Sequence, residues 1–214
     1  MARRLILFSP DCYYHIYNRG NNREPIFLEE ENYSFFLKKM CEYFDKARID
    51  IIAYCLMPNH YHLLVYLRRI ERFPISNSTK TKKISEICSN NFSNLMRSFN
   101  ISYAKSFNNW YHRTGHVFQG NFQAREIVEQ LYLTNICRYI HLNPVRAGLA
   151  PQPDDWRYSD YLEWISNVCT EESVKIKVRN LWFGTGKVYK DFVDDYATEQ
   201  KMQEEIIRIL FGKI

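Results

Sequence analysis

The chain has 214 residues, of which 46% are hydrophobic and 25% charged, and no apolar stretch approaches the length of a membrane span. This composition is that of a globular protein, and the length predicts one domain, with room for an appendage. The six cysteines form no Cys-x-x-Cys pair, which argues against a disulfide framework or a structural zinc site. We therefore expect a reduced, cytoplasmic protein without a membrane segment.

The net charge of +5 is unevenly distributed along the chain. Residues 151–214 hold nine Lys/Arg against twelve Asp/Glu, whereas residues 1–150 hold twenty against twelve. A basic body suits a polyanionic partner such as nucleic acid, although solubility alone would also explain a charge of this size. The 16% of aromatic residues can fill a core or, interleaved with basic residues, stack on unpaired bases.

The first part of the chain predicts a strand, a helix and two further strands. Residues 12–18 are β-prone and end at a turn signal, and an apolar pattern with a helical period follows. Residues 49–57 predict a second strand. Pro58 and Asn59 then turn the chain into an adjacent antiparallel strand over residues 60–67.

The next part begins with a polar, mainly basic loop at residues 68–83, which is either solvated or an arm that follows a phosphate backbone. A helical pattern covers residues 84–107, and residues 115–128 suggest another strand. A further helix starts near Glu129. Proline disfavours the helical state of the residue before it, so we expect this helix to end or kink at Pro144.

The order strand–helix–strand–strand–helix–strand, followed by a helix, predicts an α+β fold. A ferredoxin-like or RRM-like antiparallel sheet with helices packed on it is the simplest such arrangement. We assign this domain to residues 1–150. Residues 151–214 are acidic and aromatic, and we interpret them as a C-terminal extension that wraps the domain or forms a small partner-binding subdomain, with a last helix around residues 204–210.

Two histidines alternate with a bulky residue at the start of the strand over residues 60–67. Residues two apart in a strand share a face, so His60 and His62 should project side by side while Tyr61, Leu63 and Val65 enter a core. Neutral imidazoles are common metal ligands. Local hydrogen bonds would satisfy such a pair equally well, and two ligands leave a divalent ion in need of a third donor.

The helix that follows Glu129 offers candidates for the missing groups. Tyr139 and Asn143 are four residues apart and hence lie on one helix face. The amide oxygen of Asn143 suits a hard cation, and the hydroxyl of Tyr139 suits attack on phosphorus once it is activated. On spacing alone, a packed core residue is the favoured interpretation of Tyr139.

Four segments in the same order resemble the REP-associated tyrosine transposases, which are relatives of the single-tyrosine HUH transposases. The segments are YHIYNRG at 14–20, MPNHYHLL at 57–64, GHVFQG at 115–120 and RYIHLNPVRAGL at 138–149. The likeness covers about residues 10–195.

The resemblance implies a DNA-cutting enzyme with a divalent metal ion, Mg²⁺ or Mn²⁺. His60 and His62 match the metal-binding motif of that family, and Tyr139 matches its nucleophile. Asn143 stands where a polar metal contact is expected, at a position that is usually Gln in single-tyrosine transposases. Such a transposase cleaves and rejoins single-stranded DNA beside REP-like hairpins through a 5′-phosphotyrosine intermediate.

Polar and basic residues near these motifs are candidates for contacts with single-stranded or hairpin DNA, although any of them could instead pair with acids or cap a helix. They are Arg19, Asn21, Arg23, Arg113, His116, Arg125, Arg138 and Arg146.

Two other functions remain open on the sequence. The protein could be a domesticated binder of DNA or RNA hairpins that no longer cuts, or a metal phosphoesterase of another kind. The C-terminal extension could cover the dimer surface used by smaller relatives, so we favour a monomer over a homodimer.

Overall fold

The computed structural model describes residues 7–69, 84–166 and 173–195, which contain one antiparallel sheet. Its strands are β1 (Cys12–Arg19), β2 (Ile49–Met57), β3 (His60–Leu67) and β4 (Gln123–Ile127). The order across the sheet is β2-β3-β1-β4, and each neighbouring pair is antiparallel. Because β3 lies between β1 and β2, the sheet is the split βαβ arrangement that the sequence predicted.

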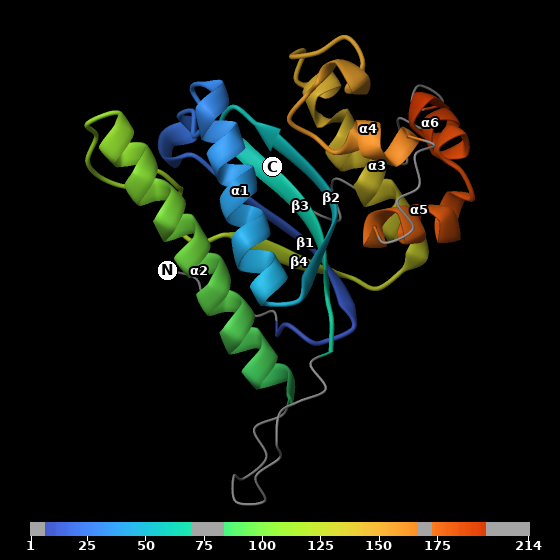
Figure 1. Ribbon diagram of the computed structural model, residues 1–214, viewed down its shortest axis with the longest axis horizontal. Coiled ribbons are helices and arrows are strands. Elements are labelled where there is room, and N and C mark those ends of the chain that lie inside the picture. Colours follow the sequence, from blue (N-terminus) through green and yellow to red (C-terminus); the bar gives the residue numbers. More distant parts are fainter. Residues whose placement is uncertain (1–6, 70–83, 167–172, 196–214) are drawn as a thin grey trace, which may run out of the picture.

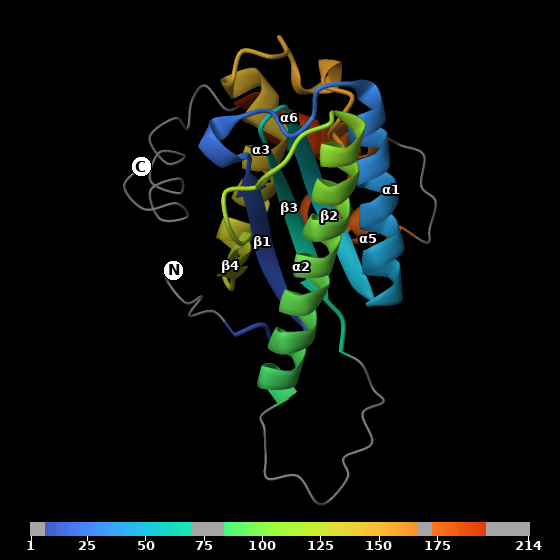
Figure 2. The same cartoon turned by 90° about the vertical axis from the view of Figure 1, so that its left-hand side faces the viewer.

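Helices cover both faces of the sheet (Figure 1). On one face lie α1 (Glu30–Lys46) and α2 (Ile84–Trp110), which run side by side across the strands in Figure 2. On the other face lie α3 (Gln130–Arg146), α4 (Tyr161–Ile165), α5 (Val174–Phe183) and α6 (Gly186–Asp194). Two short 3₁₀ turns, η1 (Asn21–Arg23) and η2 (Pro153–Asp155), complete the described elements.

The alternation of side chains along β3 divides the interior into two cores. Tyr61, Leu63 and Val65 are fully buried in the core beneath α1 and α2. Leu64 points the other way and packs into the core shared with α3. His62 precedes it by two residues and therefore faces α3 as well, as the strand period predicted.

The strand predicted over residues 115–128 is much shorter in the structure. Gly115 and Gly120 have positive φ angles of 91° and 73°, which an extended strand does not accommodate. Apart from an isolated bridge between Gly20 and Phe118, regular pairing starts only at Gln123. The intervening loop is important because it forms one wall of the site described below.

Helix α3 continues past Pro144 to Arg146, so the predicted end of the helix at that proline is wrong. Pro144 lies in the last turn, where its missing N–H removes one hydrogen bond close to the helix end. The backbone carbonyls of Asn143 and Pro144 accept hydrogen bonds from the N–H groups of Ala147 and Leu149. Asn143 therefore keeps its place on the same helix face as Tyr139.

The apolar surroundings of Cys41, Cys55 and Cys137 in the sequence predict that all three are buried. Cys55 and Cys137 are buried, whereas Cys41 is exposed on α1. The apolar period of α1 placed it beside the buried face, but the helix turns its side chain toward solvent.

The described part of the C-terminal extension shares a core with α3 and the sheet. Trp156 and Trp164 donate their indole N–H groups to the β2 carbonyls of Leu56 and Ile52, each at 3.0 Å. The domain boundary at residue 150 remains a prediction. The basic loop at 68–83 and the helix expected at 204–210 lie almost entirely outside the described residues.

Asp160, at the start of α4, is the centre of a buried polar network behind α3. One of its carboxylate oxygens accepts the Tyr54 backbone N–H at 2.7 Å and the His141 Nε2–H at 2.9 Å. The other accepts from Lys175 Nζ at 2.8 Å. Asp160 and His141 are fully buried. Burial by itself opposes ionisation, but Lys175 and His141 lower the pKa of Asp160 to about 2.

We predict that Asp160→Asn lowers the free energy of unfolding by about 3–5 kcal/mol, because it leaves Lys175 and His141 without their buried anion. Chemical denaturation at pH 7 measures the change. The exposed Asp191 on α6 supplies the matched control, since Asp191→Asn should change stability by no more than about 0.5 kcal/mol. Equal effects of the two substitutions would contradict the role given to Asp160.

The same network predicts acid sensitivity. The folded-state pKa of Asp160 is about 2, below the ordinary value of 3.8, so its contribution is complete above about pH 4 and disappears as the pH falls toward 2. Denaturation curves at several pH values should therefore converge for the wild type and Asp160→Asn at the acid end. A constant difference down to pH 2 would contradict the assignment.

Candidate functional site

A pocket of about 660 Å³ opens where the ends of β1 and β3 meet α3. It is lined by Tyr17, Asn18, Arg19, Arg23, Asn59, His60, His62, Gln119, Asn121, Gln123 and Tyr139. The structure thus brings His60 and His62 together with Tyr139, although nearly eighty residues separate them in the sequence. Arg19 and Arg23, two predicted DNA contacts, lie in the same pocket.

Both histidines of the pair are held from their Nδ1 side. His60 Nδ1 lies 2.6 Å from Asn59 Oδ1, and His62 Nδ1 lies 3.0 Å from Nε2 of the buried His15. Burial lowers the pKa of His60 to about 4 and holds the pKa of His62 well below its ordinary value. The two rings are therefore neutral near pH 7, the state in which imidazole binds a metal ion.

Tyr139 faces these rings from α3. Its ring centroid lies 5.4 Å from that of His62, with the two planes nearly perpendicular. The Arg146 guanidinium lies over the Tyr139 ring, 5.3 Å from its centroid. Burial raises the pKa of Tyr139, while Asn143 and Arg146 act in the opposite direction. The phenol is consequently protonated at neutral pH.

Asn143 completes this side of the pocket from the next turn of α3. Its side chain lies within hydrogen-bonding reach of both His60 and Tyr139. It is 9% exposed, and its Nδ2 is buried without a hydrogen-bond partner among the described residues. A buried N–H donor without a partner indicates that the site would hold a hydrogen-bond acceptor next to Asn143.

The donor set fits a divalent cation that is completed by other oxygens. Within the described ranges, no three His, Cys, Asp or Glu side chains are grouped so as to hold a metal ion. His60 and His62 can supply two neutral nitrogens, and Asn143 is the nearest candidate for an oxygen. Such a site is incomplete without water or substrate oxygens, which is the arrangement that Mg²⁺ usually adopts in phosphate chemistry.

The basic wall of the pocket is built on a tight turn after β1. Arg19 donates its Nε–H to Gln119 Oε1. A Cβ atom on Gly20 would approach the Glu24 carbonyl oxygen to 1.9 Å, so only glycine fits between Arg19 and η1. The tight turn that Gly20 permits sets the position of Arg23. It also explains why glycine follows Arg19 in the first motif.

The other predicted DNA residues have different surroundings. Asn21 donates its backbone N–H to Val117 at 2.9 Å, and Arg113 forms an ion pair with Glu24 at 2.6 Å. His116 is exposed, and Arg125 is half-buried on β4 in register with His15. Neither Arg113 nor Arg125 lines the pocket, so both remain predictions from the sequence.

Arg138 is not available to DNA in this fold. It is fully buried, donates to Asn135 Oδ1 at 2.6 Å and to the Phe192 carbonyl at 3.2 Å, and stacks on the Phe192 ring. Although it precedes Tyr139 in the sequence, the helical turn directs it to α6 instead. The prediction of a DNA contact at Arg138 is therefore corrected to a packing role.

Some residues that line the pocket were not predicted as site residues from the sequence. Tyr17 pairs with His62 across β1 and β3, and its face follows from the strand register, which the sequence does not show. Gln119, Asn121 and Gln123 belong to the segment mistaken for a continuous strand. The repeated Gln and Asn residues of that segment could have indicated a polar binding surface, since side-chain amides both donate and accept hydrogen bonds.

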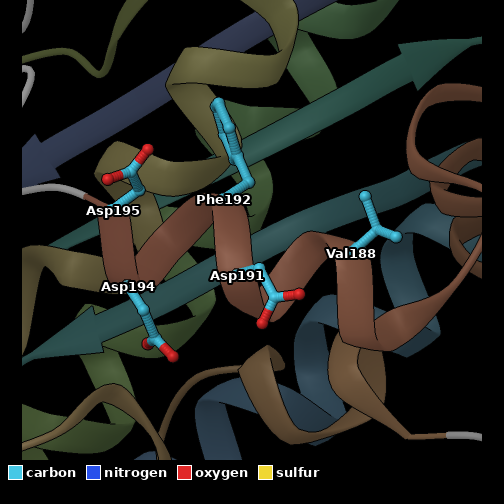
Figure 3. Close-up of a pocket in the computed structure, with 5 residues that line it drawn as sticks. All are labelled: Val188, Asp191, Phe192, Asp194 and Asp195. Atoms are coloured by element: carbon cyan, nitrogen blue, oxygen red, sulfur yellow. The ribbon is translucent and has the colours of Figure 1, made fainter.

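A second hollow of about 610 Å³ lies on α6 (Figure 3). It is lined by Val188, Asp191, Phe192, Asp194 and Asp195. Its acidic lining is unsuited to a polyanion, and it contains none of the predicted site residues. Among the described residues, no helix is both long and apolar enough to cross a membrane.

Comparisons with known proteins agree with this geometry. Residues 8–88 match the family model described as "Transposase IS200 like". A protein of Haemophilus influenzae, whose name provisionally places it among the REP-associated tyrosine transposases, is 26% identical over 129 residues. This alignment covers 58% of the chain and 64% of the relative, so the chain spans less than two thirds of that protein.

A solved structure titled as a REP-associated tyrosine transposase bound to a REP hairpin superposes with a TM-score of 0.56 at 16% identity. The superposition covers 78% of this chain and 87% of that one, and at this identity it establishes the fold. The family match, the relative and the shared fold agree with the resemblance found in the four motifs. In its motifs and its fold, the chain is similar to the REP-associated tyrosine transposases.

Proposed function

We propose that the protein is a metal-dependent transposase that cleaves and rejoins single-stranded DNA beside hairpins through a 5′-phosphotyrosine intermediate. The observation that carries this proposal is the placement of Tyr139 across one pocket from His60 and His62. A nucleophilic hydroxyl and two neutral imidazoles at a polar pocket suit phosphoryl transfer.

In the proposed reaction, the Tyr139 hydroxyl oxygen attacks the scissile phosphorus. The bond from phosphorus to the 3′ oxygen breaks, which leaves a 5′-phosphotyrosine and a free 3′-hydroxyl. The phenol loses its proton during the attack, and the departing 3′ oxygen gains one. Attack by a 3′-hydroxyl on the phosphotyrosine reverses these bond changes and joins the strands.

His60, His62 and Asn143 would hold the cation in this site. When bound, Mg²⁺ or Mn²⁺ would polarise the phosphate and neutralise the charge that develops on it. The chain itself contributes the orientation of the nucleophile: Asn143 contacts Tyr139, and Arg146 lies over its ring.

The polar wall of the pocket supports DNA as the substrate. Arg19 and Arg23 are cations at the mouth of the site, where they would contact the phosphates on either side of the cut. The chain's relative in the superposition is titled as bound to a REP hairpin, which supports a hairpin ligand here. Tyr139 and the histidine pair line one pocket of the same chain, so the proposed site needs no residue from a second subunit.

The leading alternative is a protein that binds hairpins and no longer cuts. The geometry favours cleavage, because Tyr139 and Asn143 are not only retained but directed at the histidine pair. A binding protein would have no need of a phenol held in that position.

We predict that Tyr139→Phe abolishes covalent capture of DNA, because it removes the attacking oxygen while leaving the ring in place. The assay incubates the protein and Mn²⁺ with hairpin-bearing single-stranded DNA from the flanks of its own gene, and then resolves adducts on a denaturing gel. Tyr132→Phe, on the same helix and also half-buried, is the matched control and should retain adduct formation. Adducts of undiminished yield with Tyr139→Phe would show that another residue is the nucleophile.

We also predict that His60→Ala reduces Mn²⁺-dependent cleavage by at least about 100-fold, because one of two protein nitrogens is lost from the metal site. Binding of the hairpin in the presence of EDTA should be nearly unchanged. His116→Ala tests an exposed histidine outside the pocket and should leave Mn²⁺ dependence intact. If the wild type binds hairpins but never cleaves with Mg²⁺ or Mn²⁺, the binding alternative is correct.

A further inference from the structure

The residue behind the histidine pair, His15, is unused by the proposed chemistry. It lies on β1, next to β3 in the sheet, and is fully buried. Its Nε2 atom is 3.0 Å from Nδ1 of His62. No role for His15 is predicted from the sequence, although the residue belongs to the first of the four motifs.

The contact between these two rings is an in-plane hydrogen bond. The ring planes differ by only 18°, and the centroids are 5.1 Å apart. The centroids of rings stacked face to face lie closer together than this. A centroid distance of 5.1 Å fits two nearly coplanar rings whose nitrogens are 3.0 Å apart. One proton therefore lies between His15 and His62, and one ring must donate while the other accepts.

The direction of this bond decides which nitrogen of His62 can bind a metal ion. If His62 donates its Nδ1–H, its lone pair is at Nε2. If His15 donates instead, the single N–H proton of the neutral His62 ring is at Nε2, and that nitrogen has no lone pair for a metal ion. The two arrangements differ only in tautomer, so heavy-atom distances alone do not distinguish them.

His60 shows which arrangement the site uses for its other ligand. Asn59 donates its Nδ2–H to the Arg23 carbonyl at 3.3 Å, which directs its Oδ1 toward His60. An amide oxygen can only accept, so His60 donates its Nδ1–H and has its lone pair at Nε2. An acceptor at the Nδ1 side is the usual support of a metal-bound histidine.

We propose that His15 is a positioning residue that accepts the Nδ1–H of His62 and thereby directs the Nε2 lone pair of His62 to the metal ion. This inference rests on the proposed metal site. His15 and Asn59 would then be equivalent supports, one for each ligand.

The geometry of His62 leaves one nitrogen for a metal ion. Its Nδ1 atom faces His15, so only Nε2 remains for the ion. A metal ion at Nε2 requires the lone pair of that nitrogen, so the proton of the neutral His62 ring lies on Nδ1 and His15 accepts it.

The tautomer is measured directly by ¹⁵N NMR of the histidine rings in the metal-free wild-type protein. We expect His62 to carry its proton on Nδ1. A proton on Nε2 of His62 would overturn the proposal, and this reading depends on neither metal binding nor a variant that must fold.

The second measurement is the Mn²⁺ affinity of two variants of nearly equal volume. His15→Gln retains an acceptor near the position of Nε2, and His15→Met does not. We expect His15→Met to bind Mn²⁺ about 10–100-fold more weakly than the wild type, and His15→Gln to recover most of this loss. Hairpin binding in EDTA should be the same for all three proteins.

The outcomes separate the two proposals. If the wild type binds Mn²⁺ no better than His60→Ala, the proposed metal site itself is wrong. If the wild type binds and His15→Met, folded by circular dichroism, binds equally well, only the role of His15 is overturned. Should His15→Met fail to fold, the NMR tautomer of the wild type decides.

Discussion

The packing of α3 against the sheet is the interaction on which the candidate site depends. The front of this helix presents Tyr139 and Asn143 to the histidine pair, while its back directs His141 to the buried Asp160. Because Asp160 also binds β2 and α5, a single buried anion joins the helix, the sheet and the C-terminal helices. A loss of this anchor would disturb the position of the nucleophile without any change to the pocket residues themselves.

Burial determines the protonation states at the front of α3. The low polarity around His60 and His62 disfavours their charged forms, and the same effect keeps the phenol of Tyr139 protonated. The pocket can thus receive a cation without first losing protons from its imidazoles. In such a site each electrostatic contact to a phosphate is stronger than in water, which favours chemistry that neutralises charge on phosphorus.

The sequence was most informative where one local pattern determined the structure. The apolar alternation and the Pro58-Asn59 turn gave the bounds of β2 and β3 and the shared face of His60 and His62. Packing between elements far apart in the chain could not be predicted from the sequence. Nothing near Arg138 showed that α6 would cover that side of α3, and nothing near His15 showed that its partner would be His62. Likewise, only the family resemblance predicted that Tyr139 lies beside the histidine pair of β3.

The buried network also bears on whether α3 belongs to the sheet of its own chain. Exchange of this helix with a second subunit would separate His141 from Asp160 unless the C-terminal helices moved with it. That separation would expose or orphan a carboxylate whose hydrogen bonds come from Tyr54, His141 and Lys175. Arg138, which stacks on Phe192 of α6, adds a second contact between α3 and the C-terminal extension. A helix fixed on both sides to elements of one chain is best suited to act within that chain, which is the physical basis for a site that needs no second subunit.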